Sequence, residues 1–367
     1  MELLNALPNR IAYFISGHGY GHAVRSARLI NTLLATSQVT VYTSIERAFF
    51  ERELVADFDY VELELDCGCV QLGALDVDIE ATFERYNAIN EARVNLLEIS
   101  CAHLSDQGAE LVIGDVPPLA FAAANKLNLP SLAISNFTWD EIYAEYSHDD
   151  PRFIPLLESI RKDYACADSY LRLYPGLPDH PFRHDSPTGM LCRTNARERE
   201  LVAQQLQLDL KRKWCLIYIG EYGVDGIAWQ RLKRFHDWQF LGLYPLPGAA
   251  ENYQQIQLHR EIDHADVLAN CDLVLGKLGY GLVSECLYWG RPIAYTPRAR
   301  FAEHAVLSDA VRHHGLGLEL SHEDLSACNL DNALLWSERN PKDPYRQSAL
   351  AEILNKISEI QQRKNPE

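Results

Sequence analysis

The chain has 367 residues, enough for two domains of ordinary size. Hydrophobic residues make up 47% and charged residues 23% of the sequence, which are typical globular values, so the composition excludes a disordered or fibrous protein. The 51 acidic residues exceed the 34 basic ones by 17, and this negative charge disfavours nucleic acid as a partner and allows at most a peripheral contact with a membrane.

The cysteine pattern favours a reducing compartment. The nine cysteines are odd in number and scattered, and most lie in apolar runs, as free thiols do. Cys67 and Cys69 form the only close pair in the sequence, and a loop explains them more simply than a zinc site, because no second pair accompanies them. Met1–Arg10 has neither a basic leader nor a long apolar stretch. We therefore expect a soluble cytoplasmic protein without a metal.

In the first half of the chain, short apolar runs alternate with amphipathic stretches, which is typical of parallel strands joined by crossover helices and predicts an α/β fold. The predicted strands are Ile11–Ser16, Val39–Thr43, Leu111–Gly114 and Ser131–Ile134. The predicted helices are Ala23–Ala35, Ile79–Leu104 and Leu119–Leu127. Asp76-Val-Asp78, ahead of the long helix, is better explained as a helix cap than as a metal-binding pair.

Prolines crowd the stretch Tyr174–Thr188 and interrupt this alternation, so we predict an inter-domain linker there. The pattern then resumes with strands at Cys215–Ile219, Gln239–Leu243, Leu273–Gly276 and Pro292–Tyr295. The helices predicted with them are Ala196–Leu206, Asp263–Ala269, Leu282–Trp289 and His304–His314. We expect domains at 1–180 and 190–340, and a terminal segment, 341–367, whose helix at Tyr345–Arg363 can pack back on the first domain.

A glycine-rich turn follows the first predicted strand and runs directly into a helix. It consists of Gly17, His18, Gly19, Tyr20, Gly21 and His22. The spacing lacks the third glycine of a dinucleotide-binding turn. A histidine at the first helical position points toward a bound ligand and titrates near neutral pH, as a general base should, which makes His22 a candidate catalytic residue. The alternative is a simple hydrogen bond at the start of the helix.

The run from Gly19 to Arg25, Gly-Tyr-Gly-His-x-x-Arg, resembles the N-terminal signature of GT-B glycosyltransferases related to the N-acetylglucosaminyltransferase of peptidoglycan synthesis. It is also similar to the UDP-sugar hydrolase of pseudaminic acid biosynthesis and to the glycosyltransferase-like N-terminal region of plant L-arabinokinases. In the first two groups, the histidine that matches His22 lies at the reaction centre. The resemblance therefore places the glycine turn on the acceptor side of such a site.

A second glycine-rich turn connects the predicted strand Leu273–Gly276 to a helix. Unpaired N–H groups in the first turn of that helix would form an anion site, and Lys277 adds a positive charge. An ordinary strand-turn-helix is the alternative. The pattern Gly-x-x-x-x-Ser-Glu, followed by Gly290-Arg-Pro292, resembles the donor-nucleotide motif of the same family, whose glutamate holds the ribose. The candidate donor-binding residues here are Lys277, Gly279, Tyr280, Gly281, Ser284 and Glu285.

Other matches to the family suggest further donor contacts. Arg193, in Cys192-Arg193-Thr194, resembles the arginine that meets the diphosphate, and Gly220 lies where the family has a phosphate-facing glycine. Glu303 and His304 occupy the loop that contacts the donor sugar. Two departures from the family are Glu303, which replaces an amide, and an unexpected Glu221.

The block from Ser135 to Tyr146 resembles an Asn-Phe-Ser-Trp-Asp segment of the arabinokinase region. Its aromatic rings and carboxylates suit a sugar, which makes Asn136, Trp139, Asp140 and Glu141 candidates for acceptor binding or catalysis. A buried aromatic core is the alternative. Asp115, at the end of the strand Leu111–Gly114, is a further catalytic candidate.

The resemblance implies a GT-B fold, in which two Rossmann-like domains have parallel sheets facing an interdomain cleft. It further implies a nucleotide-sugar donor as a co-substrate rather than a cofactor, an unknown acceptor, no metal, and inversion at the anomeric carbon. His22 would remove the acceptor's proton, and Asp115, Asp140 and Glu141 are the alternative candidates for the base. The alternatives are a nucleotide-sugar hydrolase or epimerase on the same scaffold, and a non-catalytic nucleotide-sugar-binding protein.

Overall fold

The computed structural model describes residues 7–72, 76–220, 225–259, 261–298, 300–339 and 343–364. The chain divides into two compact units. Unit 1 contains the chain up to Val70, Val77–Leu191 and the chain from Ser348, and unit 2 contains Gln71–Asp76 and Cys192–Gln347. Within the described part, no helix has the length and apolar character needed to cross a membrane.

Unit 1 is built on a seven-stranded sheet in which all neighbouring strands are parallel. Its order is β3-β2-β1-β6-β7-β8-β9. The strands are β1 (Arg10–Ile15), β2 (Gln38–Thr43), β3 (Asp59–Glu62), β6 (Leu111–Asp115), β7 (Ser131–Ser135), β8 (Ser169–Leu173) and β9 (Asp185–Thr188). The order reverses at β1, between β2 and β6. Ligands of open α/β sheets bind beyond the carboxyl ends of the strands at such a reversal.

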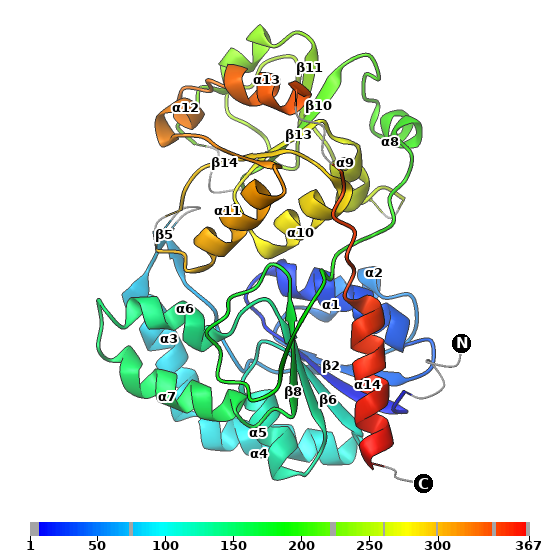
Figure 1. Ribbon diagram of the computed structural model, residues 1–367, viewed down its shortest axis with the longest axis vertical. Coiled ribbons are helices and arrows are strands. Elements are labelled where there is room, and N and C mark those ends of the chain that lie inside the picture. The colour runs from blue at the N-terminus through cyan, green and yellow to red at the C-terminus, as the bar shows by residue number, and fades with distance from the viewer. Residues whose placement is uncertain are drawn as a thin grey trace. The chain divides into compact units, whose positions relative to one another are not determined.

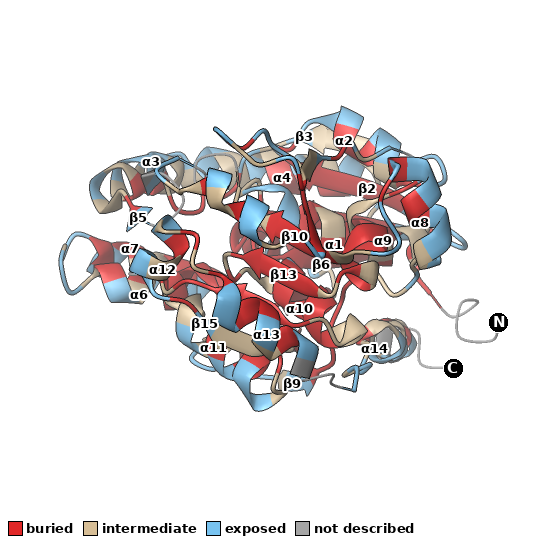
Figure 2. Cartoon of the chain, turned by 90° about the horizontal axis from the view of Figure 1, so that it is seen from above, coloured by how far each residue is buried: buried red, intermediate tan, exposed pale blue. Residues whose placement is uncertain are grey.

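Both faces of this sheet are covered by helices, which explains the nearly continuous apolar runs of its strands. Ile11, Tyr13 and Ile15 pack in one core cluster with α1, α2 and α14, whereas Ala12 and Phe14 pack in another with α4 and α5. The helices of unit 1 are α1 (Tyr20–Leu33), α2 (Arg47–Glu53), α3 (Ile79–Glu91), α4 (Arg93–Asp106), α5 (Leu119–Lys126), α6 (Trp139–Tyr146), α7 (Phe153–Tyr164) and α14 (Leu350–Lys364). Figure 2 shows the central strands buried, with exposed residues on the outer sides of the helices.

The last helix returns to the unit in which the chain begins. Ile353, Ile357 and Ile360 of α14 are buried in the same core cluster as Ile11 and Leu111. In Figure 1 this helix, drawn in red, lies along unit 1. Spacings of three and four residues place these isoleucines on one face of the helix, so a single apolar stripe attaches it to the sheet.

Unit 2 repeats the same architecture with a six-stranded parallel sheet of order β12-β11-β10-β13-β14-β15. Its strands are β10 (Lys213–Tyr218), β11 (Trp238–Gly242), β12 (Tyr253–Gln255), β13 (Leu273–Gly276), β14 (Ile293–Tyr295) and β15 (Gly317–Glu319). Its helices are α8 (Arg199–Leu206), α9 (His264–Asn270), α10 (Tyr280–Trp289), α11 (Glu303–His313), α12 (His322–Ser326), α13 (Asp331–Arg339) and the 3₁₀ helix Trp229–Arg234. Two short strands, β4 (Gln71–Leu72) and β5 (Asp76–Val77), form a separate ladder.

The α/β class and the central strands are confirmed, but several predicted boundaries are wrong. The long helix expected at Ile79–Leu104 is two helices, separated at Ala92. The stretch Tyr174–Thr188, predicted as a linker, contains β9, and unit 1 continues to Leu191. The terminal helix begins at Leu350, not Tyr345. Asp78 caps α3 by accepting a hydrogen bond from the Ala81 amide, as predicted.

We predict that Ile357→Ala lowers the free energy of unfolding of the chain by about 2–5 kcal/mol, because it leaves a cavity in the core of unit 1. Ile357 has an exposed fraction of 0%. The matched control is Ile154→Ala, since Ile154 is 51% exposed and should change stability by only a few tenths of a kcal/mol. Urea unfolding followed by circular dichroism measures both variants. Equal stabilities of the two would contradict the packing of α14 described above.

Candidate functional site

The candidate site of unit 1 lies at the reversal of strand order. The ends of β1 and β6 are paired there, with Ile15 opposite Asp115, and the Ser16 amide donates to the Asp115 carbonyl at 3.1 Å. Helix α1 begins at Tyr20, so His22 is its third residue rather than its first, which corrects the sequence expectation. This offset turns the His22 ring toward the end of β6, and the side chain is buried.

Three side chains form a buried polar cluster at this point. His22 Nδ1 lies 3.0 Å from Asp115 Oδ1 and 2.8 Å from Arg25 Nη2. Arg25 binds Asp115 with two donors: Nε donates to Oδ2 at 2.7 Å, and Nη2 donates to Oδ1. The Ser26 hydroxyl also donates to Asp115 Oδ2, at 2.9 Å. Asp115 thus organises three residues of α1 from the end of the neighbouring strand.

The charges of this cluster keep Asp115 ionised and His22 neutral. Burial alone would raise the pKa of Asp115, but Arg25 and His22 outweigh it, so this pKa lies well below its usual value. Burial and the adjacent Arg25 guanidinium lower the pKa of His22, and the attraction of Asp115 opposes them only in part. A neutral imidazole next to an ionised carboxylate has the composition of a general base with its orienting partner.

Arg25 is the functional residue that sequence reasoning missed, although it belongs to the quoted motif. Its Nη1 donates to Asn136 Oδ1, and Asn136 Nδ2 donates to the carbonyls of Leu173 and Pro175 at 3.2 and 2.7 Å. Asn136, predicted as an acceptor ligand, therefore uses both polar atoms of its side chain to anchor Arg25 to β8 and the chain after it.

Two aromatic rings lie close to His22. The ring of Phe137 lies 5.5 Å from that of His22, and the Trp139 ring lies 6.5 Å from it, measured between centroids. Trp139 also meets His18 edge to face at 5.5 Å and stacks on Tyr143 at 5.5 Å. The Trp139 side chain, a candidate for acceptor binding, is buried, as the alternative of an aromatic core predicts.

Asp66, in the loop after β3, is a second residue that the sequence analysis missed, because no motif contains it. Its Oδ1 accepts from the Ser16 hydroxyl and its Oδ2 from Trp139 Nε1, both at 2.8 Å. The next residues of this loop support the turn, because a Cβ added to Gly68 would lie 2.0 Å from the His18 ring. Burial outweighs the two hydrogen bonds and raises the pKa of Asp66 to about 6.

Two other predicted residues of α6 have contacts away from His22. Asp140 accepts from Arg161 Nε of α7 at 2.8 Å, and its Oδ1 is buried without a partner among the described residues. Glu141 accepts from the amide and hydroxyl of Thr138 in a capping box and from the Asp179 amide at 2.7 Å. Burial raises the pKa of Asp140 above its usual value and that of Glu141 to about 7.

The glycine turn itself is shaped by close packing. Gly17 packs against Ser44, because a Cβ there would lie 1.9 Å from Ser44 Oγ and the serine side chain would have to turn away. Gly19, with a φ of 73°, precedes the first turn of α1, and space around Gly21 is open. Tyr20 is 51% exposed and donates from its hydroxyl to Glu46 Oε1 at 2.8 Å.

Unit 2 places its predicted residues at the corresponding point of its own sheet. The order reverses between β10 and β13, where Tyr218 pairs with Gly276. A Cβ added to Gly220 would lie 3.5 Å from Lys277 Nζ, so Lys277 crosses this turn. Burial and the nearby Arg298 lower the pKa of Lys277. Glu221 lies outside the described residues.

Helix α10 follows β13 and begins after Gly279. Its first residues are Tyr280 and Gly281, and the space around the backbone of Gly279 and Gly281 is open. The helix has ten residues, so its first-turn N–H groups and its dipole favour an anion. Ser284, in the second turn, is buried, and its carbonyl accepts from the Cys192 thiol at 3.8 Å.

Glu285 is buried on α10 and has a partner that was not predicted. Its Oε2 lies 3.1 Å from Nδ1 of His264, the first residue of α9. Nε2 of His264 is buried and has no partner in the described structure, while the Tyr218 ring lies 4.6 Å from the imidazole. Arg193 Nη1 lies 3.4 Å from Oδ2 of Asp263, the residue that precedes His264.

The remaining predicted donor residues lie at the start of α11. Glu303 is the first residue of this helix, and His304 donates its amide to the Phe301 carbonyl at 2.9 Å. Burial and the nearby cations Arg298 and Arg312 lower the pKa of His304, although Glu319 opposes them. None of the hydrogen bonds or ion pairs described above joins these two residues to Glu285.

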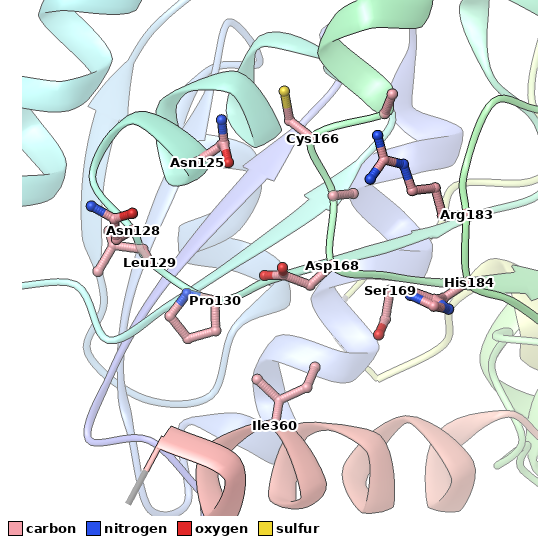
Figure 3. A pocket seen from close by; sticks show the side chains of 12 residues that line it. Asn125, Asn128, Leu129, Pro130, Cys166, Asp168, Ser169, Arg183, His184 and Ile360 are labelled. Carbon is pink, nitrogen blue, oxygen red and sulfur yellow. The ribbon is translucent and has the colours of Figure 1, made fainter.

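A separate cavity of about 760 Å³ lies in unit 1. Asn125, Asn128, Asp168, Arg183 and His184 contribute polar side chains to it, as Figure 3 shows. These residues lie at the amino ends of β7, β8 and β9, the sheet edge opposite to the one that carries His22 and Asp115. Among the described residues, no group of three or more His, Cys, Asp or Glu side chains is arranged to hold a metal ion.

Comparison with models of protein families gives no match. The sequence is 30% identical to L-arabinokinase of Arabidopsis thaliana over 324 residues, which are 86% of this chain. The chain spans 30% of the length of that relative.

Solved structures share the fold over nearly the whole chain. The kitacinnamycin glycotransferase has a TM-score of 0.65 at 18% identity, covering 97% of this chain and 95% of its own. The glycosyltransferase VinC, solved with dTDP, has a TM-score of 0.63 at 14% identity, covering 96% and 100%. MurG of Acinetobacter baumannii has a TM-score of 0.58 at 14% identity, covering 96% and 100%. The predicted GT-B glycosyltransferase fold is therefore confirmed.

We predict that Asp66→Asn becomes relatively more stable as pH rises. The raised pKa means that the wild-type Asp66 contributes stability below about pH 4 that is lost as the pH rises through about 6. Asparagine does not ionise, so the free energy of unfolding of the variant, compared with wild type, should improve by about 1–3 kcal/mol between pH 4 and pH 7. Denaturant unfolding at several pH values measures this difference.

The matched control is Asp149→Asn, because Asp149 is an exposed residue of the same unit. Its stability difference from wild type should change little over this range. If the stability difference between Asp66→Asn and wild type also stays constant with pH, burial does not raise the pKa of the Asp66 carboxyl.

Proposed function

We propose that the chain is a glycosyltransferase that transfers a sugar from a nucleotide-diphosphate donor to an acceptor hydroxyl. The observation that carries this proposal is the His22–Asp115 pair, which lies at the ligand-binding reversal of a sheet with the glycosyltransferase fold. The fold alone does not specify an activity, whereas a buried imidazole 3.0 Å from a carboxylate supports a step of proton transfer.

In the proposed reaction, His22 accepts the proton of the acceptor hydroxyl through Nε2 as the oxygen attacks the anomeric carbon. Asp115 accepts the Nδ1–H hydrogen bond and stabilises the imidazolium that forms. The bond from the anomeric carbon to the diphosphate oxygen breaks on the opposite side, so direct displacement inverts the configuration of that carbon. His22 and Asp115 require of the acceptor only a hydroxyl that can reach Nε2.

We assign the donor to unit 2. The N–H groups of the first turn of α10, Lys277 and Arg193 supply positive charge for the diphosphate, and Glu285 supplies an acceptor for the ribose hydroxyls. These groups belong to the chain itself, so we propose that transfer needs no metal. The nine thiols, eight of them buried, are typical of a chain kept in a reducing compartment, and we place the reaction in the cytoplasm.

A nucleotide-sugar hydrolase is a second candidate, and a specific observation favours it. Asn136 and Glu141, the polar groups expected to bind an acceptor, are committed to contacts within unit 1. Water needs no such ligands. Incubation with UDP-, GDP- and dTDP-sugars, with and without a panel of sugar and small-molecule acceptors, separates the two. Acceptor-dependent product indicates transfer, whereas acceptor-independent release of free sugar indicates hydrolysis.

We predict that His22→Ala lowers kcat by about 10²–10⁴-fold, because it removes the general base, and leaves the donor Kd nearly unchanged, because the donor binds unit 2. Steady-state kinetics and calorimetry measure the two quantities. His148→Ala is the control, since His148 is an exposed histidine of the same unit. Full activity of His22→Ala would show that another residue is the base.

We also predict that Glu285→Ala weakens donor binding by about 10–150-fold, the equivalent of losing a hydrogen bond to a charged group, about 1.5–3 kcal/mol. Calorimetry with the donor that supports turnover measures the Kd. Glu323→Ala, which changes an exposed glutamate of unit 2, should leave it unchanged. If the folded Glu285→Ala variant binds the donor with wild-type affinity, Glu285 does not contact the ribose as proposed.

A further inference from the structure

Nδ1 of His22 lies between two groups with opposite hydrogen-bonding character. It is 2.8 Å from Arg25 Nη2 and 3.0 Å from Asp115 Oδ1. A guanidinium can only donate, and an ionised carboxylate can only accept. Nδ1 carries either a proton or a lone pair, so it can bond with only one of the two at a time.

The choice of partner decides what the other ring nitrogen can do. When Nδ1 carries the proton, it donates to Asp115, and Nε2 has a free lone pair that can act as a base. When Nδ1 accepts from Arg25, the proton lies on Nε2, and the ring can only donate to a substrate. Exchange between these forms releases one proton from Nε2 to water and takes one from water at Nδ1, so the ring stays neutral.

The surroundings favour Arg25 as the partner. Asp115 already accepts from Nε and Nη2 of Arg25 and from the Ser26 hydroxyl, so it stays satisfied without His22. Arg25 is fixed through Nη1 by Asn136, which holds two backbone carbonyls. Because the guanidinium cannot turn away, a proton on Nδ1 would face its N–H group at 2.8 Å.

We propose that Arg25 is a positioning residue that holds resting His22 in the tautomer with its proton on Nε2 and thereby limits its use as a base. In the proposed function, on which this inference rests, an acceptor hydroxyl that donates to Nε2 selects the minor, Asp115-bonded tautomer. A ligand oxygen that needs a donor meets the resting form instead. His22 can therefore exchange the roles of donor and base without a change of charge.

The protonation of His22 depends on all the charged groups around it. Arg25 lies on the same helix as His22, and Asp115 comes from β6. Burial raises the pKa of Tyr13 on β1, and the charges of Asp115 and Arg25 act on it in opposite directions. Asp66 accepts from Trp139 Nε1, the Trp139 ring centroid lies 6.5 Å from that of His22, and the Asp115 charge also acts on Asp66. Among the described contacts, only Arg25 and Asp115 lie within hydrogen-bonding distance of His22 Nδ1. A substitution of Arg25 should therefore change the tautomer of His22 directly.

Long-range ¹H–¹⁵N correlation spectra of the full chain report which ring nitrogen carries the proton. The His22 signals are assigned by their loss in His22→Gln. In wild type at pH 8, without substrate, we expect most molecules to have the proton on Nε2. A predominance of the Nδ1–H tautomer in wild type would overturn the proposal without any other variant.

Two substitutions separate the charge of Arg25 from its directed N–H group. Arg25→Lys keeps a cation beside Asp115 but lacks the planar fork, so the Nδ1–H tautomer should become the major one. Arg25→Met also removes the charge, so the titration of His22 should additionally move to higher pH, because the Arg25 guanidinium is one of the groups that lower the pKa of His22. Arg47→Lys, at an exposed arginine, should change neither quantity.

Unchanged tautomer populations in folded Arg25→Lys would overturn the proposal. If Arg25→Met does not fold, Arg25→Lys and the wild-type spectrum still decide it. The test is independent of turnover: full activity of His22→Ala would refute the proposed base while the spectra could still show control by Arg25. An inactive His22→Ala variant together with unchanged tautomer populations in Arg25→Lys would support His22 as the base and show that Arg25 does not control its tautomer.

Discussion

The buried ion pair between Arg25 and Asp115 is the interaction on which the unit 1 site depends. Both side chains lie out of water, and a charge in such a place is tolerated only when its hydrogen bonds are complete. Their partners come from α1, from β6 and, through Asn136, from the chain that follows β7 and β8. The pair thus joins segments that are far apart in the sequence. They meet at the reversal of strand order, where open α/β sheets bind their ligands.

The two units use the same position in the sheet in different ways. In unit 1, the polar atoms around Asp115 are nearly all bonded to one another, so a ligand meets a preformed arrangement. In unit 2, His264 Nε2 is buried without a partner in the described structure, and the backbone around Gly279 and Gly281 is open. Unfilled hydrogen-bonding capacity of this kind suits a large polar ligand, whereas a completed cluster suits the transfer of a single proton.

Much of the fold could be predicted from the sequence because parallel strands buried on both faces leave plain apolar runs, as in Ile11–Ser16 and Leu273–Gly276. The turn histidine and Asp115 were found for a related reason, since each lies at the end of such a run. Strand β9 was missed because Pro187 and its neighbours read as a linker, yet an edge strand tolerates proline. Arg25 binds Asp115, 90 residues away, and Asp66 binds Trp139, 73 residues away, and no local pattern reveals such tertiary contacts.

Much of the polar side-chain capacity near His22 is used within unit 1. Asn136, Glu141 and Asp66 accept hydrogen bonds from groups of the unit itself, and these bonds hold Arg25, α6 and Trp139 in place. Unit 1 also offers the open backbone at Gly21 and the exposed ring of Tyr20, in the same turn as His22, the proposed base. Such a surface selects by shape and by one reactive hydroxyl rather than by a set of hydrogen bonds. In the proposed reaction, the choice between a sugar, an aromatic alcohol and water is therefore decided by what the glycine turn admits to His22, and the carboxylates of the neighbouring loops act by keeping that turn in place.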